Sequence, residues 1–504
     1  MVLHPLFFCS DLKIISFFDH KTKKQNLGFD FYGFMLYYRY IQDPERGFIK
    51  MNLADYNRIH FIGIGGISMS SLAEILAHEG KTVSGSDMKA SPLTQHLEES
   101  GIKVCIGQKA ENITPDMELI VYTAAVSADN PEFIAAKASG AKVIDRAELV
   151  GTLMLTYKYP ISVAGTHGKT TTSSILTEIF LEAGTDPTIS LGGVLNTIGG
   201  NFRIGKNDYF VVETCEYRDS FLKFNPHSAV ILNVDKDHTD YFKDLDHIYR
   251  SFNTFAKRLP EGGTLVINSD IKDVERVTDG VKAKIVTYGT KGDWTAENIS
   301  FNAAGFGRYT ACYKGEKQAE IALSIPGLHN VYNSLAAFAI AKVYGLKTED
   351  IVKGIDNYKG VDRRFQHKGE FNGVVVVDDY AHHPTEIAAT INSARSGSAK
   401  TLWIVFQPHT YTRTHDLLDE FAQALSKSDK VVVLDIYAAR EKDTGLVHSK
   451  DLVEKINALG GAEAFYQPSF EAAEEFLKNS CQSGDILITM GAGDVFKLGE
   501  SLVK

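Results

Sequence analysis

Hydrophobic and polar residues alternate in a regular way from Met51 onward. Short apolar runs are followed by stretches in which apolar residues recur every three or four positions. Short apolar runs are typical of buried strands, and the wider spacing indicates helices with one buried face. Their alternation predicts an α/β fold, because parallel strands are joined by crossover helices. We expect three α/β domains, over residues 51–150, 151–360 and 361–504.

Residues 1–50 do not follow this pattern. They are rich in Phe and Tyr but show neither strand alternation nor a sustained helical face. Asp11, Asp19 and Lys21 interrupt any signal-peptide design, and no uncharged run approaches the roughly 20 residues that span a bilayer. We interpret this segment as an atypical extension that is not native, and we expect the natural start at Met51. Recovering peptides from residues 1–50 of the native protein would contradict this hypothesis.

The first block contains a glycine-rich turn between a predicted strand and a predicted helix. In RIHFIGIGGIS, Gly63, Gly65 and Gly66 follow the strand, and Asp87 ends the next strand. Such glycines let the backbone approach a diphosphate at a helix N-terminus, while an acidic residue about 20 positions later binds a ribose hydroxyl. Ser68 stands where the third glycine of that motif belongs. A nucleotide diphosphate site and a merely tight structural turn both remain open here.

The second block opens with a phosphate-binding sequence, YPISVAGTHGKTTT. Backbone amides from Gly165 to Thr170 can surround phosphate oxygens at the start of the following helix. Lys169 can reach the β- and γ-phosphates, and the Thr170 hydroxyl can ligate Mg²⁺. Val163 replaces the first glycine of the strict motif. The alternative is an ordinary glycine-rich turn.

Acidic residues follow two later strands of the same block. Glu213 ends YFVVE, and the strand SAVILNV is followed by Asp235, Asp237, His238 and Asp240. Ligands of parallel sheets gather where the strands end, and carboxylates are suitable Mg²⁺ ligands there. Taken alone, Glu213 could be a solvated carboxylate, and the cluster could be a turn with aspartate caps and a satisfied histidine. Their occurrence behind a phosphate loop favours a metal site.

Composition excludes several classes of partner. The chain has 53 basic and 63 acidic residues, a net charge of -10, so no overall positive field attracts nucleic acid or an anionic membrane. Its 5 cysteines form no paired motif, which suits a reducing cytoplasm.

The third block holds His382, His383 and His409 in two short loops. Zinc is disfavoured there because no cysteine accompanies them.

Seven motifs from Met51 to Lys504 together resemble the Mur ligases, the ATP-dependent amino-acid-adding enzymes of peptidoglycan synthesis. In chain order they are GTHGKTTT, ETCEYRDSFL, NVDKDHTDYF, GLHNVYNSLAA, GVDRRFQ, DDYAHHPTE and FQPHTYTRT. The resemblance implies three domains. A Rossmann-like N-terminal domain would bind the UDP of the substrate, a central phosphate-loop ATPase domain would bind ATP, and a Rossmann-like C-terminal domain would close over the ATP and carry the amino-acid site.

The form FQPHTYTRT is found in family members that join L-alanine to UDP-N-acetylmuramate. The resemblance therefore implies ATP as co-substrate, Mg²⁺ as cofactor, an acyl-phosphate intermediate, ADP and phosphate as products, and a bacterial cytoplasmic location. A recycling ligase that adds a tripeptide to the same UDP-sugar is the related alternative. Folylpolyglutamate synthase lacks the N-terminal UDP domain. An NAD-dependent oxidoreductase would leave the phosphate loop unexplained, and a nucleotide-gated binding protein would leave the third block unexplained.

The resemblance also implies the functional residues. The expected catalytic residues are Lys169, Glu213, His238, Arg364 and His382. The expected ATP contacts are Gly165, Thr166, His167, Gly168, Lys169, Thr170, Thr171, His329, Asn330, Asn333, Arg364 and Asp379. The expected Mg²⁺ ligands are Thr170, Glu213 and His238. The expected UDP-sugar contacts are Gly63, Gly65, Gly66, Asp87 and Ser127, and the expected alanine contacts are Tyr380, His382, His409 and Arg413.

Two observations modify this assignment. His329, Asn330 and Asn333 precede a predicted helix, so the residues alone favour helix capping over an adenine pocket. Some sister ligases carry a carbamylated lysine about fifteen residues after the metal-binding histidine. Asn253 occupies that position here, and we therefore expect no carbamate.

Overall fold

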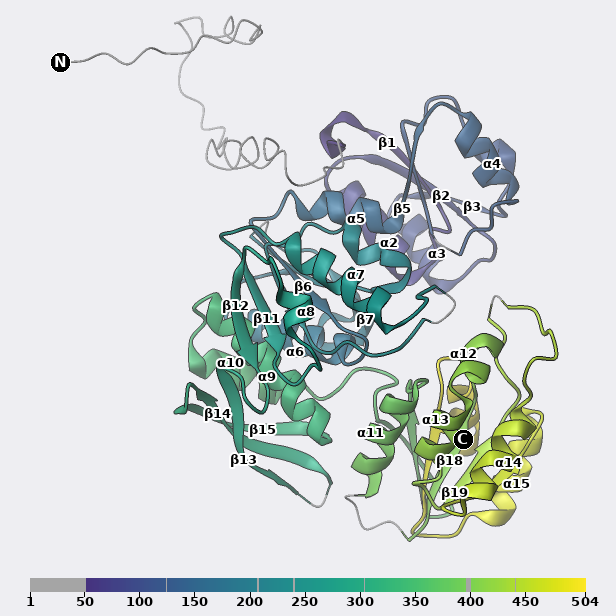
Figure 1. Cartoon of the computed structure of the whole chain (residues 1–504). Helices are drawn as coiled ribbons and strands as arrows, with labels where there is room; N and C mark the ends of the chain where they lie inside the picture. The colour runs from purple at the N-terminus through teal and green to yellow at the C-terminus, as the bar shows by residue number, and fades with distance from the viewer. Residues whose placement is uncertain are drawn as a thin grey trace, which may run out of the picture. The chain divides into compact units, whose positions relative to one another are not determined.

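The structure, a computed structural model, contains three β-sheets with helices packed on them (Figure 1). It describes residues 51–123, 125–205, 208–238, 241–302, 304–395, 400–439 and 441–504. The hypothesis about residues 1–50 concerns a segment outside the described residues. No helix within the described ranges is long and apolar enough to cross a membrane.

The first sheet has five parallel strands in the order β3-β2-β1-β4-β5. The strands are β1 (Arg58–Ile62), β2 (Thr82–Asp87), β3 (Lys103–Ile106), β4 (Leu119–Tyr122) and β5 (Lys142–Asp145). Its helical segments are η1 (Leu53–Asp55), α2 (Ile67–His78), α3 (Pro92–Glu99), η2 (Ala110–Asn112), α4 (Pro131–Ala138) and α5 (Arg146–Met154). Ile62 pairs with Ser86 and with Tyr122, and Tyr122 pairs with Asp145. The carboxyl ends of four strands therefore lie in one row.

The second sheet has ten strands in the order β15-β14-β13-β12-β11-β10-β6-β9-β7-β8. Its first strands are β6 (Tyr159–Ala164), β7 (Thr188–Leu195), β8 (Gly200–Arg203), β9 (Tyr209–Glu213) and β10 (Ser228–Ile231). They are followed by β11 (Thr264–Asn268), β12 (Lys284–Tyr288), β13 (Trp294–Phe301), β14 (Phe306–Tyr313) and β15 (Glu316–Pro326). β9, β6, β10, β11 and β12 pair in parallel, and β13 joins β12 in parallel through Trp294 and Tyr288. β13, β14 and β15 then pair antiparallel with one another.

The helices of this second part are α6 (Lys169–Glu182), η3 (Asn196–Ile198), η4 (Tyr217–Lys223), α7 (Leu245–Lys257), α8 (Glu275–Thr278), α9 (Leu328–Val343) and α10 (Thr348–Asn357). Residues Thr170–Phe180 of α6 are all buried. A helix that is covered on every side is held by packing rather than by its own propensity, and α6 carries five threonines and serines in its first turns. This burial fixes the start of α6, where the phosphate loop ends.

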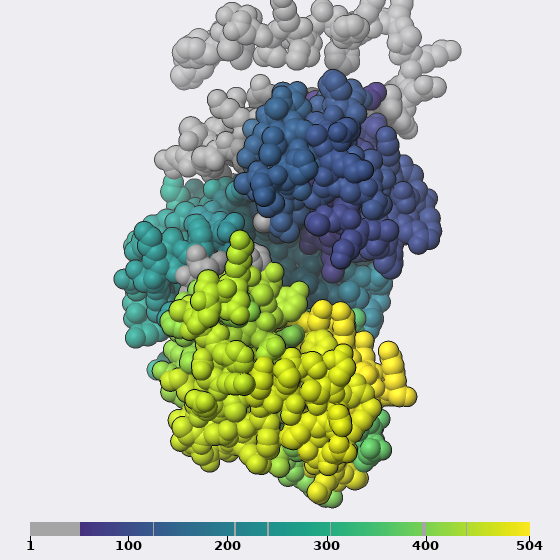
Figure 2. All heavy atoms as spheres, turned by 90° about the vertical axis from the view of Figure 1, so that its right-hand side faces the viewer, coloured from purple at the N-terminus to yellow at the C-terminus, as the bar shows by residue number. Residues whose placement is uncertain are grey.

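The third sheet has six strands in the order β16-β17-β21-β18-β19-β20, and only β16 is antiparallel. The strands are β16 (Gln366–Phe371), β17 (Val374–Asp379), β18 (Leu402–Phe406), β19 (Lys430–Val433), β20 (Glu463–Tyr466) and β21 (Ile486–Met490). The helices are α11 (Pro384–Arg395), α12 (Tyr411–Asp416), α13 (Leu418–Leu425), α14 (Ser449–Leu459), α15 (Phe470–Ser480) and α16 (Phe496–Leu502). In the space-filling view the green-to-yellow residues of this part form closely packed surface (Figure 2).

The first and second parts share a hydrophobic core, whereas the third part has cores of its own. One hydrophobic cluster joins Leu149 and Leu153 of α5 to Phe210 and Val212 of β9. The core of the first sheet thus continues into the second part. The third sheet has its own clusters, with α11, α13 and α14 on one face and α15 and α16 on the other.

The expectation of three α/β domains is confirmed, while the boundaries at residues 150 and 360 stay a prediction. The helical segment after β18 is divided into α12 and α13, because Leu417 adopts φ -119 and ψ 22, outside the helical range.

Candidate functional site: a phosphate loop at a cavity shared with the third sheet

The phosphate loop occupies the four residues between β6 and α6. Gly168, the residue before α6, has φ +81, and a Cβ atom there would lie 2.6 Å from Oδ1 of Asn333. Both facts require glycine, because left-handed backbone disfavours other residues and the neighbouring amide leaves no room for a methyl group. The loop backbone therefore approaches α9 closely, with the N-terminus of α6 directly behind it.

Lys169 lies across this loop. Its Nζ donates to the carbonyl oxygens of Gly165 at 2.5 Å and Thr166 at 2.9 Å, and pairs with Glu216 Oε2 at 3.1 Å. Burial would lower the pKa of Lys169, but the carboxylates of Glu216 and Glu213 outweigh burial and raise it. The ammonium group is therefore charged and held in place before any phosphate binds.

Oxygen donors suitable for a divalent cation lie beside Lys169. The Thr170 hydroxyl donates to Glu213 Oε1 at 3.0 Å, and Glu213 Oε2 accepts from the Gly192 amide at 2.7 Å. The Glu216 side chain is only 2% exposed, and its Oε1 atom has no hydrogen-bond partner among the described residues. A buried carboxylate oxygen without a donor is costly unless a cation approaches it. Mg²⁺, which prefers oxygen ligands, fits this donor set.

Glu216 is a site residue that the sequence analysis missed. It lies in the quoted motif ETCE, three positions after Glu213. Only Glu213 ends a strand, and the strand-end argument therefore selected it alone. The second acidic residue of that motif was the available signal.

His238 meets Glu216 rather than Glu213. Its Nε2 atom lies 3.7 Å from Glu216 Oε1 and 3.8 Å from Asp237 Oδ2. Burial lowers the pKa of His238, so its ring is neutral and able to ligate a cation. The third acidic residue of the predicted cluster, Asp240, lies outside the described residues.

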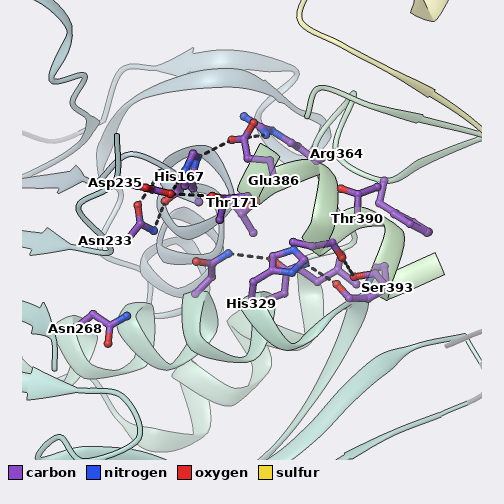
Figure 3. Close-up of a pocket in the computed structure, with 18 of the residues that line it drawn as sticks. His167, Thr171, Asn233, Asp235, Asn268, His329, Arg364, Glu386, Thr390 and Ser393 are labelled. Atoms are coloured by element: carbon purple, nitrogen blue, oxygen red, sulfur yellow. Dashed lines mark hydrogen bonds and ion pairs between the residues drawn. The ribbon is translucent and has the colours of Figure 1, made fainter. Parts of the chain in front are cut away.

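A cavity of about 330 Å³ adjoins the phosphate loop (Figure 3). Residues from both the second and the third sheets line it. Predicted ATP contacts among the lining residues are His167, Gly168, Thr171, His329, Asn330, Asn333, Arg364 and Asp379. The loop after β11 also contributes Asn268, Asp270, Ile271 and Lys272, which the sequence analysis did not select. The structure thus brings together most of the ATP set around one space.

The capping interpretation of the α9 residues is wrong. The residue before α9 is Gly327, with φ 101, and no side chain caps the helix. Asn330 Nδ2 donates to the Pro326 carbonyl at 2.7 Å, and Asn333 Nδ2 donates to Asn330 Oδ1 at 3.0 Å. These amides line the cavity from inside the first turns of the helix. Burial lowers the pKa of the neighbouring His329 to about 4, so that ring is neutral.

Glu386 of α11 is a second residue that the sequence analysis missed. Its Oε1 atom lies 3.2 Å from His167 Nδ1 and 3.9 Å from Arg364 Nη1, and its Oε2 accepts from the His382 amide at 3.2 Å (Figure 3). On its other side His167 faces Asp235, with 3.3 Å between Nε2 and Oδ2. Burial would lower the pKa of His167, but both carboxylates outweigh it and raise this pKa to about 9. His167 is therefore a cation at the rim of the cavity.

Polar contacts connect the residues after β10 to the third sheet. The Thr385 hydroxyl donates to Asp235 Oδ2 at 2.8 Å, and His383 Nε2 lies 2.8 Å from the Lys236 carbonyl. His167, Asp235 and His383 also form the one group within the described residues whose geometry could hold a metal ion. His167 is protonated and paired with carboxylates there, which disfavours a metal.

The four predicted alanine contacts lie close together. His382 has its ring 5.3 Å from that of Tyr380 and 6.2 Å from that of His409. Arg413 directs Nη1 toward His409 Nδ1 at 3.3 Å, and its Nε and Nη2 donate to Asp237 Oδ1 at 3.1 and 2.9 Å. The Arg413 and Asp237 side chains are 11% and 7% exposed. The guanidinium expected to bind the amino-acid carboxylate is thus already held by a protein carboxylate.

Asp379, which lines the cavity, accepts hydrogen bonds from the backbone of two segments of the third part. Its Oδ2 accepts from the Phe365 amide at 2.9 Å, and its Oδ1 accepts from the Ala381 amide at 2.7 Å. Burial raises the pKa of Asp379 to about 6, although Arg364 opposes this shift. Asp379 therefore fixes the chain that carries Arg364 and Tyr380.

The predicted UDP-sugar residues lie along the carboxyl edge of the first sheet. Gly63 has φ +85, and a Cβ atom there would lie 2.7 Å from Thr123. Asp87 Oδ2 accepts from the Gly65 amide at 2.9 Å, so this carboxylate fixes the glycine turn. Ser127, in the loop after β4, is exposed.

Three family models match the chain in succession. They are described as Mur ligase family, catalytic domain, over residues 58–158, Mur ligase middle domain, over residues 163–341, and Mur ligase, glutamate ligase domain, over residues 363–493. The chain belongs to the Mur ligase family. Each model coincides with one of the three sheets, so the shared cavity lies between the middle and the third parts of a Mur ligase.

Relatives extend the match to the whole described region. The chain is 51% identical over 461 residues to the UDP-N-acetylmuramate--L-alanine ligase of Acetivibrio thermocellus, covering 90% of this chain and 98% of that protein. It is 53% identical over 456 residues to the Lachnospira eligens protein of the same name, covering 89% and 99%. A crystal structure of the Thermotoga maritima UDP-N-acetylmuramate-alanine ligase matches with a TM-score of 0.73 and 28% identity, covering 88% of this chain and 98% of that one.

Proposed function

We propose that this Mur ligase joins L-alanine to the lactyl carboxylate of UDP-N-acetylmuramate, using ATP and releasing ADP and phosphate. The observation that carries the proposal is the identity of 51% and 53% with two relatives bearing that name, nearly from end to end. The site geometry supports it. A phosphate loop, a cation site and a cluster of alanine-binding candidates surround one region, as consecutive phosphoryl and acyl transfer require.

A carboxylate is a poor acyl donor, so the reaction needs two steps. The lactyl carboxylate attacks the γ-phosphorus of ATP, the bond from that phosphorus to the bridging oxygen of ADP breaks, and an acyl phosphate forms. The amine of L-alanine then attacks the acyl carbon, and the tetrahedral intermediate expels phosphate. Negative charge gathers at each step, so fixed positive charge contributes most of the rate enhancement.

The charged groups of the site match these demands. Lys169 and His167 present positive charge at the phosphate loop, and Arg364 presents it from the third sheet. The cavity beside them takes the nucleoside of ATP, with His329, Asn330 and Asn333 on its wall. Tyr380, His382, His409 and Arg413 form the alanine site, and the planar fork of Arg413 suits the amino-acid carboxylate.

Magnesium belongs to this proposal as the cation of the oxygen-rich donor set. The donors are the side chains of Thr170, Glu213, Glu216 and His238. When bound, the ion supplies positive charge to phosphate oxygens without any change of protonation. Within the protein, the same carboxylates keep Lys169 charged.

The first sheet holds the sugar nucleotide in this proposal. In it the Gly63–Gly66 turn receives the diphosphate at the start of α2, and Asp87, at the end of β2, and Ser127, in the loop after β4, are the further contacts. We also propose the bacterial cytoplasm as the location, because both nucleotide substrates are cytoplasmic metabolites.

Phosphate release tests the proposal. The full chain is supplied with ATP, Mg²⁺ and UDP-N-acetylmuramate, with and without L-alanine, and the product is identified by mass spectrometry. We expect release that requires both the sugar nucleotide and alanine, together with a product heavier by one alanyl residue. The Lys169→Ala variant is the negative control.

The related alternatives give different outcomes. Turnover with a tripeptide but not with alanine would assign the chain to the recycling ligases. ATP hydrolysis without any acceptor dependence would favour a nucleotide-gated protein. A change in NADH absorbance in place of phosphate release would favour an oxidoreductase.

A further inference from the structure

Arg146, the first residue of α5, is a cation without a direct ionic partner among the described residues. It is half-buried and forms no hydrogen bond or ion pair with any described residue. Its neighbour Asp145 is already engaged, because that carboxylate caps the Glu148 amide at 2.9 Å and pairs with Lys223. The positive end of the helix dipole adds to the cost of a cation at this position. An arginine kept there needs an anionic partner.

The register of the first sheet places Arg146 in the row of substrate-binding candidates. Ser86, Ile62, Tyr122 and Asp145 pair across four neighbouring strands. The residues one step later are Asp87, Gly63, Thr123 and Arg146. Neighbouring strands are about 4.8 Å apart, so the Arg146 backbone lies about 10 Å across the sheet from Gly63. An anion extending from the glycine turn toward β5 therefore reaches the guanidinium.

Helix α5 also packs against β9, the strand of the middle domain that ends at Glu213. Val150 of α5 and Val212 of β9 belong to one hydrophobic cluster, and Glu213 follows Val212. A Cβ atom on Gly151 would lie 1.9 Å from the Lys223 carbonyl oxygen, so the helix backbone packs directly against the middle domain. The Glu213 carboxylate is among the charges that act on Arg146, while burial lowers the pKa of this arginine. Arg146 thus stands between the glycine turn and the Mg²⁺ donor set.

We propose that Arg146 binds the lactyl carboxylate of the sugar nucleotide and presents it to the phosphoryl-transfer site. This inference rests on the proposed function and adds a binding residue to it. The row position favours the carboxylate over the diphosphate, because the diphosphate belongs at Gly63, two strands away. The guanidinium fork matches a carboxylate with two parallel hydrogen bonds. The carboxylate would also supply the counter-ion that the described residues do not give Arg146.

Paired ligands test this assignment in the full chain. Calorimetric titration, with Mg²⁺ and a non-hydrolysable ATP analogue present, compares UDP-N-acetylmuramate with UDP-N-acetylglucosamine, which has the same diphosphate but no lactyl carboxylate. The proteins are the unchanged chain, Arg146→Ala, Arg146→Lys and Lys142→Ala. Lys142 is an exposed cation at the opposite end of β5 and is the matched control.

We expect Arg146→Ala to weaken UDP-N-acetylmuramate binding by about 10- to 100-fold, since it removes charge-assisted hydrogen bonds. Binding of UDP-N-acetylglucosamine should change less than about twofold, Arg146→Lys should recover part of the affinity, and Lys142→Ala should match the unchanged chain. Equal weakening for both ligands would overturn the proposal in favour of a diphosphate contact or a structural role. Unchanged affinity in Arg146→Ala would also overturn it. An unchanged chain that binds neither ligand would overturn the proposed function itself.

Discussion

Two loops of this Mur ligase have the same construction but differ in the charge of their side chains. The glycine turn joins β1 to α2, the phosphate loop joins β6 to α6, and each consists of four residues of the form Gly-x-x-Gly. Lys169 follows the phosphate loop, whereas Ile67, which is 53% exposed, follows the glycine turn. Backbone amides would suffice for the diphosphate that we propose at the glycine turn, which does not react there. The loop that we propose for phosphoryl transfer adds fixed charges, each balanced by a carboxylate.

The central positions of the two loops show the same contrast. Gly65 in the glycine turn is held through its amide by Asp87, and the equivalent His167 is held through its ring by Asp235 and Glu386. A backbone contact keeps the shape of a loop. A ring contact also gives the loop a proton that can be removed.

The largest difference in kcat is expected between substitutions of the residues that follow the two loops, Lys169 and Ile67. Lys169→Ala should lower kcat by at least about 100-fold, because it removes the fixed positive charge at the phosphate loop. Ile67→Ala should leave kcat unchanged and alter the KM for UDP-N-acetylmuramate only slightly. Phosphate release measured for both variants tests the contrast. Comparable losses in the two variants would mean that the loops share one role.

The buried ion pair between Arg413 and Asp237 has no counterpart among the described residues of the glycine turn. Arg413→Ala should raise the KM for alanine and lower the free energy of unfolding by about 3–5 kcal/mol, because Asp237 is left buried without its partner. The exposed Arg395 and Asp429 pair in the same domain is the control, and Arg395→Ala should cost at most about 1 kcal/mol. Denaturant unfolding gives both values. An equal loss of unfolding free energy in Arg413→Ala and Arg395→Ala would mean that the Arg413 pair is as exposed to solvent as the control pair.

Raising the pH should affect only the phosphate loop. Folding raises the pKa of His167 from 6.5 to about 9, so its stabilising contribution is complete below pH 6.5 and is lost as the pH rises through about 9. The loss is at most about 3 kcal/mol. The KM for ATP should rise over the same range, and that for UDP-N-acetylmuramate should not. A His167→Gln variant should lack this transition.

Equivalent glycines should tolerate alanine differently. Gly168 has φ 81 and contacts Asn333, so Gly168→Ala should cost about 1–3 kcal/mol and raise the KM for ATP. Gly66 has φ -66, and a Cβ atom there would lie 3.4 Å from the Gly63 carbonyl oxygen. Gly66→Ala should therefore cost less than about 1 kcal/mol. Thermal unfolding and ATP kinetics of the two variants test whether Gly168→Ala costs more than Gly66→Ala.

The sequence predicted the features that depend on neighbouring residues. Both loops, the strand-ending Glu213 and the three α/β parts follow from local patterns of apolar residues and glycine. Glu216 and Glu386 could not be selected in this way. Glu386 meets His167, more than two hundred positions earlier in the chain, and only tertiary packing creates that contact.

The remaining differences have the same origin. Residues alone favoured capping for Asn330 and Asn333, but Gly327 takes the position before α9 because only glycine accommodates its backbone there. The local pattern likewise does not report the break at Leu417, whose side chain lies in the core of the third sheet.

The hydrophobic cluster that joins α5 to β9 also determines which segments of this chain can be exchanged between proteins. A chimera that takes its first domain from a distant ligase would have to match the apolar surfaces of Phe210 and Val212, or aggregate. The third domain has cores of its own, so it could be transplanted without disturbing a shared hydrophobic cluster. The amino-acid site that we propose in it would therefore be exchangeable on its own, whereas the first two domains would have to be exchanged as a single unit.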